Sequence, residues 1–144
     1  MFRVKICGVR LKSDVEVVEA SGGDAVGFNF FPPSVRYVDP ESPQTAALSS
    51  EAKSLGLLSV GVFVNESVEN ILGVCQRVGL DAIQLHGDEP LEVGRKLIDV
   101  GWSVVRAVKL PKTELEPQVV DNLAGPWLEL GCHVLLDADA GAAH

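Results

Sequence analysis

The feature of this sequence that most restricts its fold is a regular alternation of short apolar segments with helical patterns. Apolar, β-branched segments occupy residues 2–7, 24–30, 57–64, 81–85, 102–108 and 132–136. The segments between them carry apolar residues at helical spacing, and several end at glycine. Successive apolar segments begin about 20 to 30 residues apart, which is the repeat of a βαβ unit. The pattern predicts an α/β protein with a parallel sheet.

Two architectures are compatible with six parallel strands. One is an open doubly wound sheet, and the other is part of a (β/α)8 TIM barrel, which normally has eight strands and about 250 residues. The sequence has 144 residues and no Asn-Gly turn between alternating runs that would indicate a hairpin. Strand number and length favour the open sheet. We expect residues 1–144 to form a single domain.

The helical segments carry recognisable end signals. Ser13 is predicted to cap the first helix. Ser42, which precedes a proline, and Ser67 are predicted to cap the next two. The Gly-Pro pair at 125–126 is predicted to interrupt the last helical segment, residues 113–130.

Charge and cysteine content exclude several classes of protein. The chain has 12 basic and 20 acidic residues, a net charge of −8 and no basic run, so we expect no nucleic-acid partner. Its three cysteines include no Cys-x-x-Cys pair, which indicates a reducing compartment without a disulfide framework or zinc knuckle. Arg3 and Lys5 interrupt the first apolar segment, and no run has membrane-spanning length. We expect a cytoplasmic protein without a membrane partner.

Polar or ionisable residues stand at the carboxyl end of every predicted strand. In parallel α/β proteins this end of the sheet carries the active site. The residues concerned are Cys7, Ser34, Arg36, Asn65, Gln84, His86, Arg106, Lys109, Asp137 and Asp139. The general polarity of loops explains some of these residues. It explains less well why a Cys and an Asp end strands that are otherwise apolar.

Cys7 and Asp137 have the chemistry of a base and an acid. Lys5 lies two residues before Cys7, on the same strand face, and a nearby cation favours a thiolate. Asp137 follows three apolar residues, and a partly apolar surrounding favours a protonated carboxyl group that can act as an acid. Arg36 lies in a long, proline-containing loop and suits a substrate carboxylate.

Other interpretations remain open from the residues alone. A single cysteine such as Cys7 is more often a small buried side chain, which is what we expect of Cys75 on the apolar stripe of its helix. Cys7, His86 and Asp137 also fit a nucleophilic triad, although no oxyanion-hole motif is present. A metal site from Cys7, His86 and His144 has no local ligand spacing to support it.

Five motifs follow one another along the chain. They are KICG at residues 5–8, GFNFFPPSVRYV at 27–38, GVFVN at 61–65, QLHGDE at 84–89 and LLD at 135–137. In this order and at this spacing, the set resembles phosphoribosylanthranilate isomerase, an enzyme family of tryptophan biosynthesis. Each motif alone is weak, but the set is specific and extends across essentially the whole chain.

The resemblance implies a (β/α)8 TIM barrel of the ribulose-phosphate-binding type in place of the open sheet. It also implies an Amadori rearrangement of N-(5-phosphoribosyl)anthranilate to 1-(2-carboxyphenylamino)-1-deoxyribulose 5-phosphate, without a cofactor or a metal. By position, Cys7 would be the general base that removes the C2 proton, and Asp137 the general acid that protonates the ring oxygen. Arg36 would bind the anthranilate carboxylate, and Gln84 and His86 would line the pocket.

The chain departs from the family after Asp137. There the family has a glycine-rich turn and strands seven and eight, whose loops bind the substrate phosphate. We therefore expect this chain to cover strands one to six of an incomplete barrel, with open edges that permit self-association. The alternative function is a catalytically inactive barrel fragment that needs a partner segment. A third interpretation is a related isomerase of histidine biosynthesis or indole-glycerol-phosphate synthase. It ranks well below the isomerase, because those families normally use other catalytic residues, and a Cys base combined with the QLHG motif argues against both.

Overall fold

A computed structural model describes residues 1–112 and 116–138 of the chain. Its strands are β1 (Lys5–Cys7), β2 (Ala25–Asn29), β3 (Leu58–Phe63), β4 (Ala82–Leu85), β5 (Val104–Leu110) and β6 (His133–Ala138). Its helices are α1 (Lys12–Ala20), α2 (Pro43–Ser54), α3 (Val68–Val78), α4 (Leu91–Asp99) and α5 (Pro117–Leu130). Strands and helices alternate throughout this part of the chain, as the apolar pattern predicts. None of these helices has the length and apolar character needed to cross a membrane.

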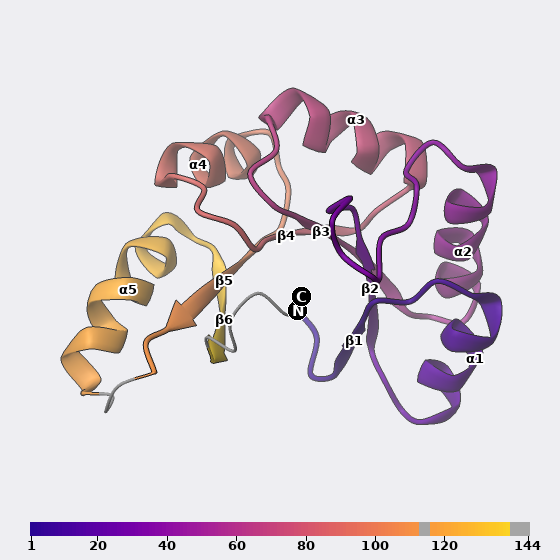
Figure 1. Cartoon of the computed structure of the whole chain (residues 1–144), viewed down its shortest axis with the longest axis horizontal. Helices are drawn as coiled ribbons and strands as arrows, with labels where there is room; N and C mark the ends of the chain where they lie inside the picture. The colour runs from indigo at the N-terminus through magenta and orange to yellow at the C-terminus, as the bar shows by residue number, and fades with distance from the viewer. Residues whose placement is uncertain (113–115, 139–144) are drawn as a thin grey trace.

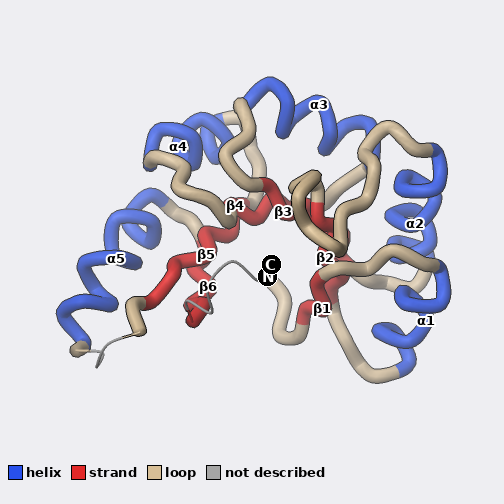
Figure 2. The backbone as a smooth tube through the Cα atoms, in the orientation of Figure 1, coloured by secondary structure: helices blue, strands red, loops and turns tan. Residues whose placement is uncertain are grey.

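The sheet is curved, and all five described helices lie on its convex side (Figure 1). Its strands are parallel and follow chain order from β1 to β6. Crossovers of one hand between strands in this order bring every helix to the same face. The tube in Figure 2 follows the resulting half-barrel, with strands inside and helices outside. The open doubly wound sheet is therefore wrong, because that architecture has helices on both faces and a reversal of strand order.

The main core lies between the strands and the helices. Phe28, Phe63, Ile83 and Leu85 are fully buried there, because alternate strand residues point toward the helices. On the concave side, a much smaller cluster of Ala25, Val60 and Ala82 is buried near the amino ends of the strands. The apolar filling is therefore at one end of the half-barrel, and polar groups occupy the other.

Two predicted helix caps are confirmed. Ser42 caps α2 and Ser67 caps α3, and their hydroxyl oxygens accept hydrogen bonds from the backbone N–H groups of Gln44 (3.3 Å) and Asn70 (3.1 Å). The prediction that Cys75 is a core residue is also confirmed, since its side chain is buried on the inner face of α3.

The predicted start of α1 is wrong by two residues. The cap position is Leu11, and Ser13 lies inside the helix. The Asp14 carboxylate accepts hydrogen bonds from the backbone N–H groups of Leu11 (2.9 Å) and Arg10 (3.1 Å). Asp14, in the first turn of the helix, therefore satisfies the N–H groups of the cap residue and of the residue before it, as the acidic residue of a capping box does.

The predicted interruption at the Gly-Pro pair is also wrong, since α5 continues through Pro126. A proline inside a helix removes one backbone hydrogen bond. Ala124 and Trp127 are buried against the rest of the protein on either side of it. Their burial offsets the lost bond. Residues 113–115 of the predicted segment lie outside the described part of the chain.

Candidate active site

The carboxyl ends of the strands surround a cavity of about 310 Å³. All five predicted site residues line it: Cys7, Arg36, Gln84, His86 and Asp137. They come from β1, the loop after β2, β4 with the residue that follows it, and β6. The remaining lining residues are Lys5, Asn29, Phe31, Val62, Val64 and Leu135. The fold therefore brings together groups as far apart in the sequence as Cys7 and Asp137.

Cys7 is the last residue of β1 and is partly buried as a free thiol. It pairs with Gly27 of β2. A β-carbon at Gly27 would lie 3.2 Å from the Cys7 sulfur. The absence of a side chain at Gly27 thus makes room for the thiol beside the neighbouring strand.

Arg36 reaches the cavity from the loop between β2 and α2, and this loop is internally hydrogen bonded. The Ser34 hydroxyl accepts from the Arg36 backbone N–H (3.1 Å), and the Val38 N–H donates to the carbonyl of Asn29 (3.0 Å). No carboxylate in the described ranges forms an ion pair with Arg36. Its guanidinium is therefore available for a carboxylate from outside the protein.

Gln84, His86 and Asp137 contact one another across the cavity. Gln84 Nε2 lies 3.1 Å from His86 Nδ1, and His86 Nε2 lies 3.3 Å from Asp137 Oδ2. Asp137 is predicted to end the sixth strand, but β6 continues to Ala138, so that Asp137 lies within it and pairs with Lys109 of β5. The strand pairing fixes the backbone position of Asp137 beside the cavity, and the Asp137 side chain is 37% exposed.

Lys5 is partly buried at the bottom of this group. Its Nζ donates a hydrogen bond to Oε1 of Gln84. Burial lowers the pKa of Lys5, and the neighbouring Cys7 acts in the opposite direction. The predicted proximity of this cation to the thiol is therefore present in the structure.

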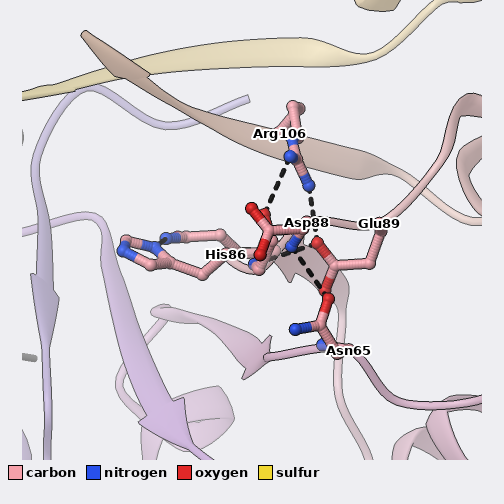
Figure 3. A network of polar contacts seen from close by, with 7 residues as sticks. Asn65, His86, Asp88, Glu89 and Arg106 are labelled. Atoms are coloured by element: carbon pink, nitrogen blue, oxygen red, sulfur yellow. Dashed lines mark hydrogen bonds and ion pairs between the residues drawn. The ribbon is translucent and has the colours of Figure 1, made fainter. Parts of the chain in front are cut away.

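Two predicted strand-end groups serve the framework instead of the cavity. Arg106 points toward the helices, where its guanidinium lies 4.6 Å from the ring centre of Trp127. It donates to Glu89 Oε1 (2.6 Å) and to the carbonyl of Gly87 (2.8 Å). Asn65 accepts a hydrogen bond from the Asp88 N–H (2.8 Å). Figure 3 shows Arg106, Glu89 and Asn65 around the loop that follows β4.

Glu89 is the centre of this network and was not predicted. Its side chain is 2% exposed, and its oxygens also accept from the backbone N–H groups of Asn65 (2.8 Å) and Gly87 (2.9 Å). The sequence gives no signal for it, because an acidic residue after a strand is ordinarily exposed. Asn29 was also missed; as a polar residue at the end of an apolar strand it could have been found.

The nucleophilic triad does not match the contacts of His86. A triad histidine uses one ring nitrogen for the acid and the other for the nucleophile. Here Nε2 faces Asp137 and Nδ1 faces Gln84, so neither nitrogen is directed at Cys7. For the metal alternative, residues 1–112 and 116–138 contain no group of three or more His, Cys, Asp or Glu side chains arranged to hold an ion. His144 and Asp139 lie outside the described residues.

Comparison with known proteins gives one consistent result. The family model of N-(5'-phosphoribosyl)anthranilate (PRA) isomerase matches residues 4–142. The N-(5'-phosphoribosyl)anthranilate isomerase of Thermotoga petrophila is 48% identical over 99 residues, which are 69% of this chain and 47% of that protein. The chain thus spans about half the length of this relative.

Solved structures agree with the sequence matches. The phosphoribosyl anthranilate isomerase of Thermotoga maritima superimposes with a TM-score of 0.83 at 37% identity, covering 99% of this chain and 64% of that one. A phosphoribosyl anthranilate isomerase in complex with reduced 1-(o-carboxyphenylamino)-1-deoxyribulose 5-phosphate gives a TM-score of 0.81 at 38% identity, covering 96% and 66%. The half-barrel therefore matches the corresponding part of these barrels.

Proposed function

The chain belongs to the N-(5'-phosphoribosyl)anthranilate isomerase family, and we propose that its strand-end cavity carries out the Amadori rearrangement of N-(5'-phosphoribosyl)anthranilate in tryptophan biosynthesis. The observation that carries this proposal is the convergence of Cys7, Arg36, His86 and Asp137 on one cavity. A thiol, a guanidinium and a carboxyl group that line one small cavity suit a phosphosugar that bears an aromatic carboxylate.

In the proposed reaction Asp137 is the general acid. It gives its proton to the ring oxygen of the sugar while the C1–O bond breaks and the anthranilate nitrogen forms a double bond to C1. Cys7, as a thiolate, then takes the proton from C2. The electrons of that C–H bond form a C1=C2 double bond while the electron pair of the C1=N double bond returns to the nitrogen. A proton gained at C1 and one lost from the C2 hydroxyl complete the ketone.

Arg36 is proposed to hold the anthranilate carboxylate by two parallel hydrogen bonds. His86 and Gln84 are proposed to line the pocket and to fix the Asp137 carboxyl group. The exposure of Arg36 and the absence of an ion pair within the described ranges support this division of roles. The product of this reaction carries the same carboxylate, so Arg36 stays in contact through both proton transfers.

The test is an isomerase assay of the chain, of Cys7→Ala and of Asp137→Asn, with product identified by chromatography. Each variant is expected to lose at least about a hundredfold in kcat, the usual contribution of a general acid or base. Asp121→Asn, on the exposed surface of α5, is the control and should keep full activity. Full activity in both cavity variants would contradict the assigned roles.

The edges of the sheet favour a second candidate function. Among the described strands, β1 and β6 each pair on one side only. Ile6 and Leu136, on their outer faces, are 47% and 52% exposed. Exposed apolar edge strands associate with further strands. In this candidate the chain is a barrel fragment, active only when a partner segment or a second copy covers these edges.

The two candidates differ in how activity depends on concentration. If the chain acts alone, specific activity stays constant on dilution, and light scattering gives the mass of one chain. If the edges must be covered, specific activity falls on dilution or appears only when the carboxyl-terminal part of a relative is added.

A further inference from the structure

A continuous chain of polar contacts runs from β1 through β4 to β6. Its members are Lys5, Gln84, His86 and Asp137. Lys5 donates to Oε1 of Gln84. Gln84 Nε2 lies 3.1 Å from His86 Nδ1, and His86 Nε2 lies 3.3 Å from Asp137 Oδ2. The first member of this chain, an ammonium group, can only donate. The direction of every later hydrogen bond depends on it.

Because Lys5 only donates, Gln84 must turn its carbonyl oxygen toward it. The amide NH₂ of Gln84 then faces His86, and it too can only donate. His86 Nδ1 must therefore accept, which requires a lone pair and no hydrogen on that nitrogen. A neutral imidazole in this state carries its hydrogen on Nε2, the nitrogen that faces Asp137.

The opposite orientation of Gln84 is unfavourable. It would place the NH₂ group against the ammonium of Lys5, donor against donor. Gln84 is only 2% exposed, so water cannot easily satisfy groups that lose their partners. Leaving one buried polar group unsatisfied costs about 1–3 kcal/mol. Lys5 thus determines which way the amide points.

We propose that Lys5 is a positioning residue that acts through Gln84 to hold His86 in the Nε2-protonated form, with this N–H directed at Asp137. One oxygen of Asp137 is then occupied by His86, and the other remains for the proton that the rearrangement needs. The role of the second Asp137 oxygen rests on the proposed function, whereas the tautomer of His86 does not.

The backbone of His86 is fixed independently of the polar contacts between Lys5, Gln84, His86 and Asp137. Its N–H donates to the carbonyl of Phe63 (2.9 Å). The loop that begins at His86 is held from the other side of the sheet by Glu89 and Arg106, as Figure 3 shows. Since the backbone is anchored there, Lys5 is left to act on the orientation of the side chains and not on the position of the loop.

The test is the nitrogen NMR spectrum of the chain labelled with ¹⁵N-histidine. The sequence has three histidines, and His86→Gln assigns the signals of His86 by their loss. In the unaltered chain, Nδ1 of His86 should show the shift of a nitrogen without hydrogen, and Nε2 should show a one-bond coupling to hydrogen. Lys5→Met, which keeps the length of the side chain but removes the donor, should shift both signals toward a mixture of tautomers.

The matched control is Lys96→Met, which removes an exposed cation from α4, away from the polar contacts, and should leave the His86 signals unchanged. A hydrogen on Nδ1 in the unaltered chain, or identical His86 signals in Lys5→Met and the unaltered chain, would overturn the role of Lys5. If Lys5→Met does not fold, the spectrum of the unaltered chain still decides the tautomer. These signals do not depend on turnover, so loss of the proposed isomerase activity and loss of the proposed tautomer are separate results.

Discussion

Gly8 lies so close to Arg36 that a β-carbon at Gly8 would be 2.4 Å from Cδ of Arg36. Gly8 also has a φ angle of +86°, which other residues rarely adopt. Glycine is therefore required here for two separate reasons. The turn that follows Cys7 leaves room for the Arg36 side chain to cross it, and this contact ties β1 to the loop after β2.

Gly8→Ala is expected to disturb both the backbone and Arg36. The matched control is Gly22→Ala, because Gly22 has a φ of +84° but no atom within 4 Å of a β-carbon. Each variant should lose about 1–2 kcal/mol of unfolding free energy from the left-handed backbone. Gly8→Ala should lose more unfolding free energy than Gly22→Ala. It should also bind reduced 1-(o-carboxyphenylamino)-1-deoxyribulose 5-phosphate, an analogue of the proposed product, more weakly. Equal urea midpoints and equal ligand affinities for the two variants would contradict the role of the contact.

The ion pair of Arg106 and Glu89 should contribute strongly to stability, because its side chains are only 12% and 2% exposed. Arg106→Met leaves the buried carboxylate without its cation and should cost about 3–5 kcal/mol. The exposed pair of Lys12 and Glu16 is the comparison, with side chains 67% and 56% exposed. Glu16→Gln should cost less than about 1 kcal/mol. Urea unfolding measures both, and similar losses would show that burial does not control the effect.

The three cysteines should differ sharply in reactivity. Burial raises the pKa of the Cys75 thiol to about 12 and also raises that of Cys132. Cys7 is only partly buried and lines the cavity. At about pH 8, a thiol reagent should modify Cys7 first, since thiolates are the reactive form. Mass spectrometry of timed samples gives the order, and Cys7→Ser should remove the fast phase. Fast labelling of Cys75 would contradict the burial of its side chain on the inner face of α3.

Asp24 should make the stability of the chain depend on acid pH. Its carboxylate accepts hydrogen bonds from the backbone N–H groups of Val4 and Arg3 (both 2.9 Å), and these bonds lower its pKa. Because the folded pKa lies below the unfolded one, the unfolded state binds more protons as the pH falls through this range. The stabilisation is complete above the unfolded pKa and is lost as the pH falls through the folded pKa.

Asp24→Asn should therefore be less stable than the unaltered chain at neutral pH, with a difference that shrinks as the pH falls below about 4. Thermal unfolding between neutral and acid pH measures it. Glu16→Gln is the control, because it removes an exposed carboxylate that accepts no hydrogen bond from a backbone N–H group of the described residues. Its difference in stability from the unaltered chain should change less with pH. A difference for Asp24→Asn that does not vary with pH would contradict the assignment.

The repeat of strands and helices, the caps at Ser42 and Ser67 and the polar strand ends were all predictable. Each depends on residues close together in the sequence, whose spacing and side-chain chemistry act locally. The five motifs added the barrel architecture and the family. The register of β5 was not predictable, because it depends on pairing between distant segments. Arg106 pairs with Leu85, and it lies on the helix side of the sheet, whereas Gln84 points into the cavity.

The sequence by itself determined the alternation of elements, the family and the set of polar groups from which a site could be made. Only the tertiary structure decided which groups meet. The curvature of the sheet brings Asp137 to His86, and the turn at Gly8 admits Arg36. Burial makes Glu89 part of the framework. These relationships depend on side-chain direction and on contacts between segments that are far apart in the chain, which local residue patterns do not encode.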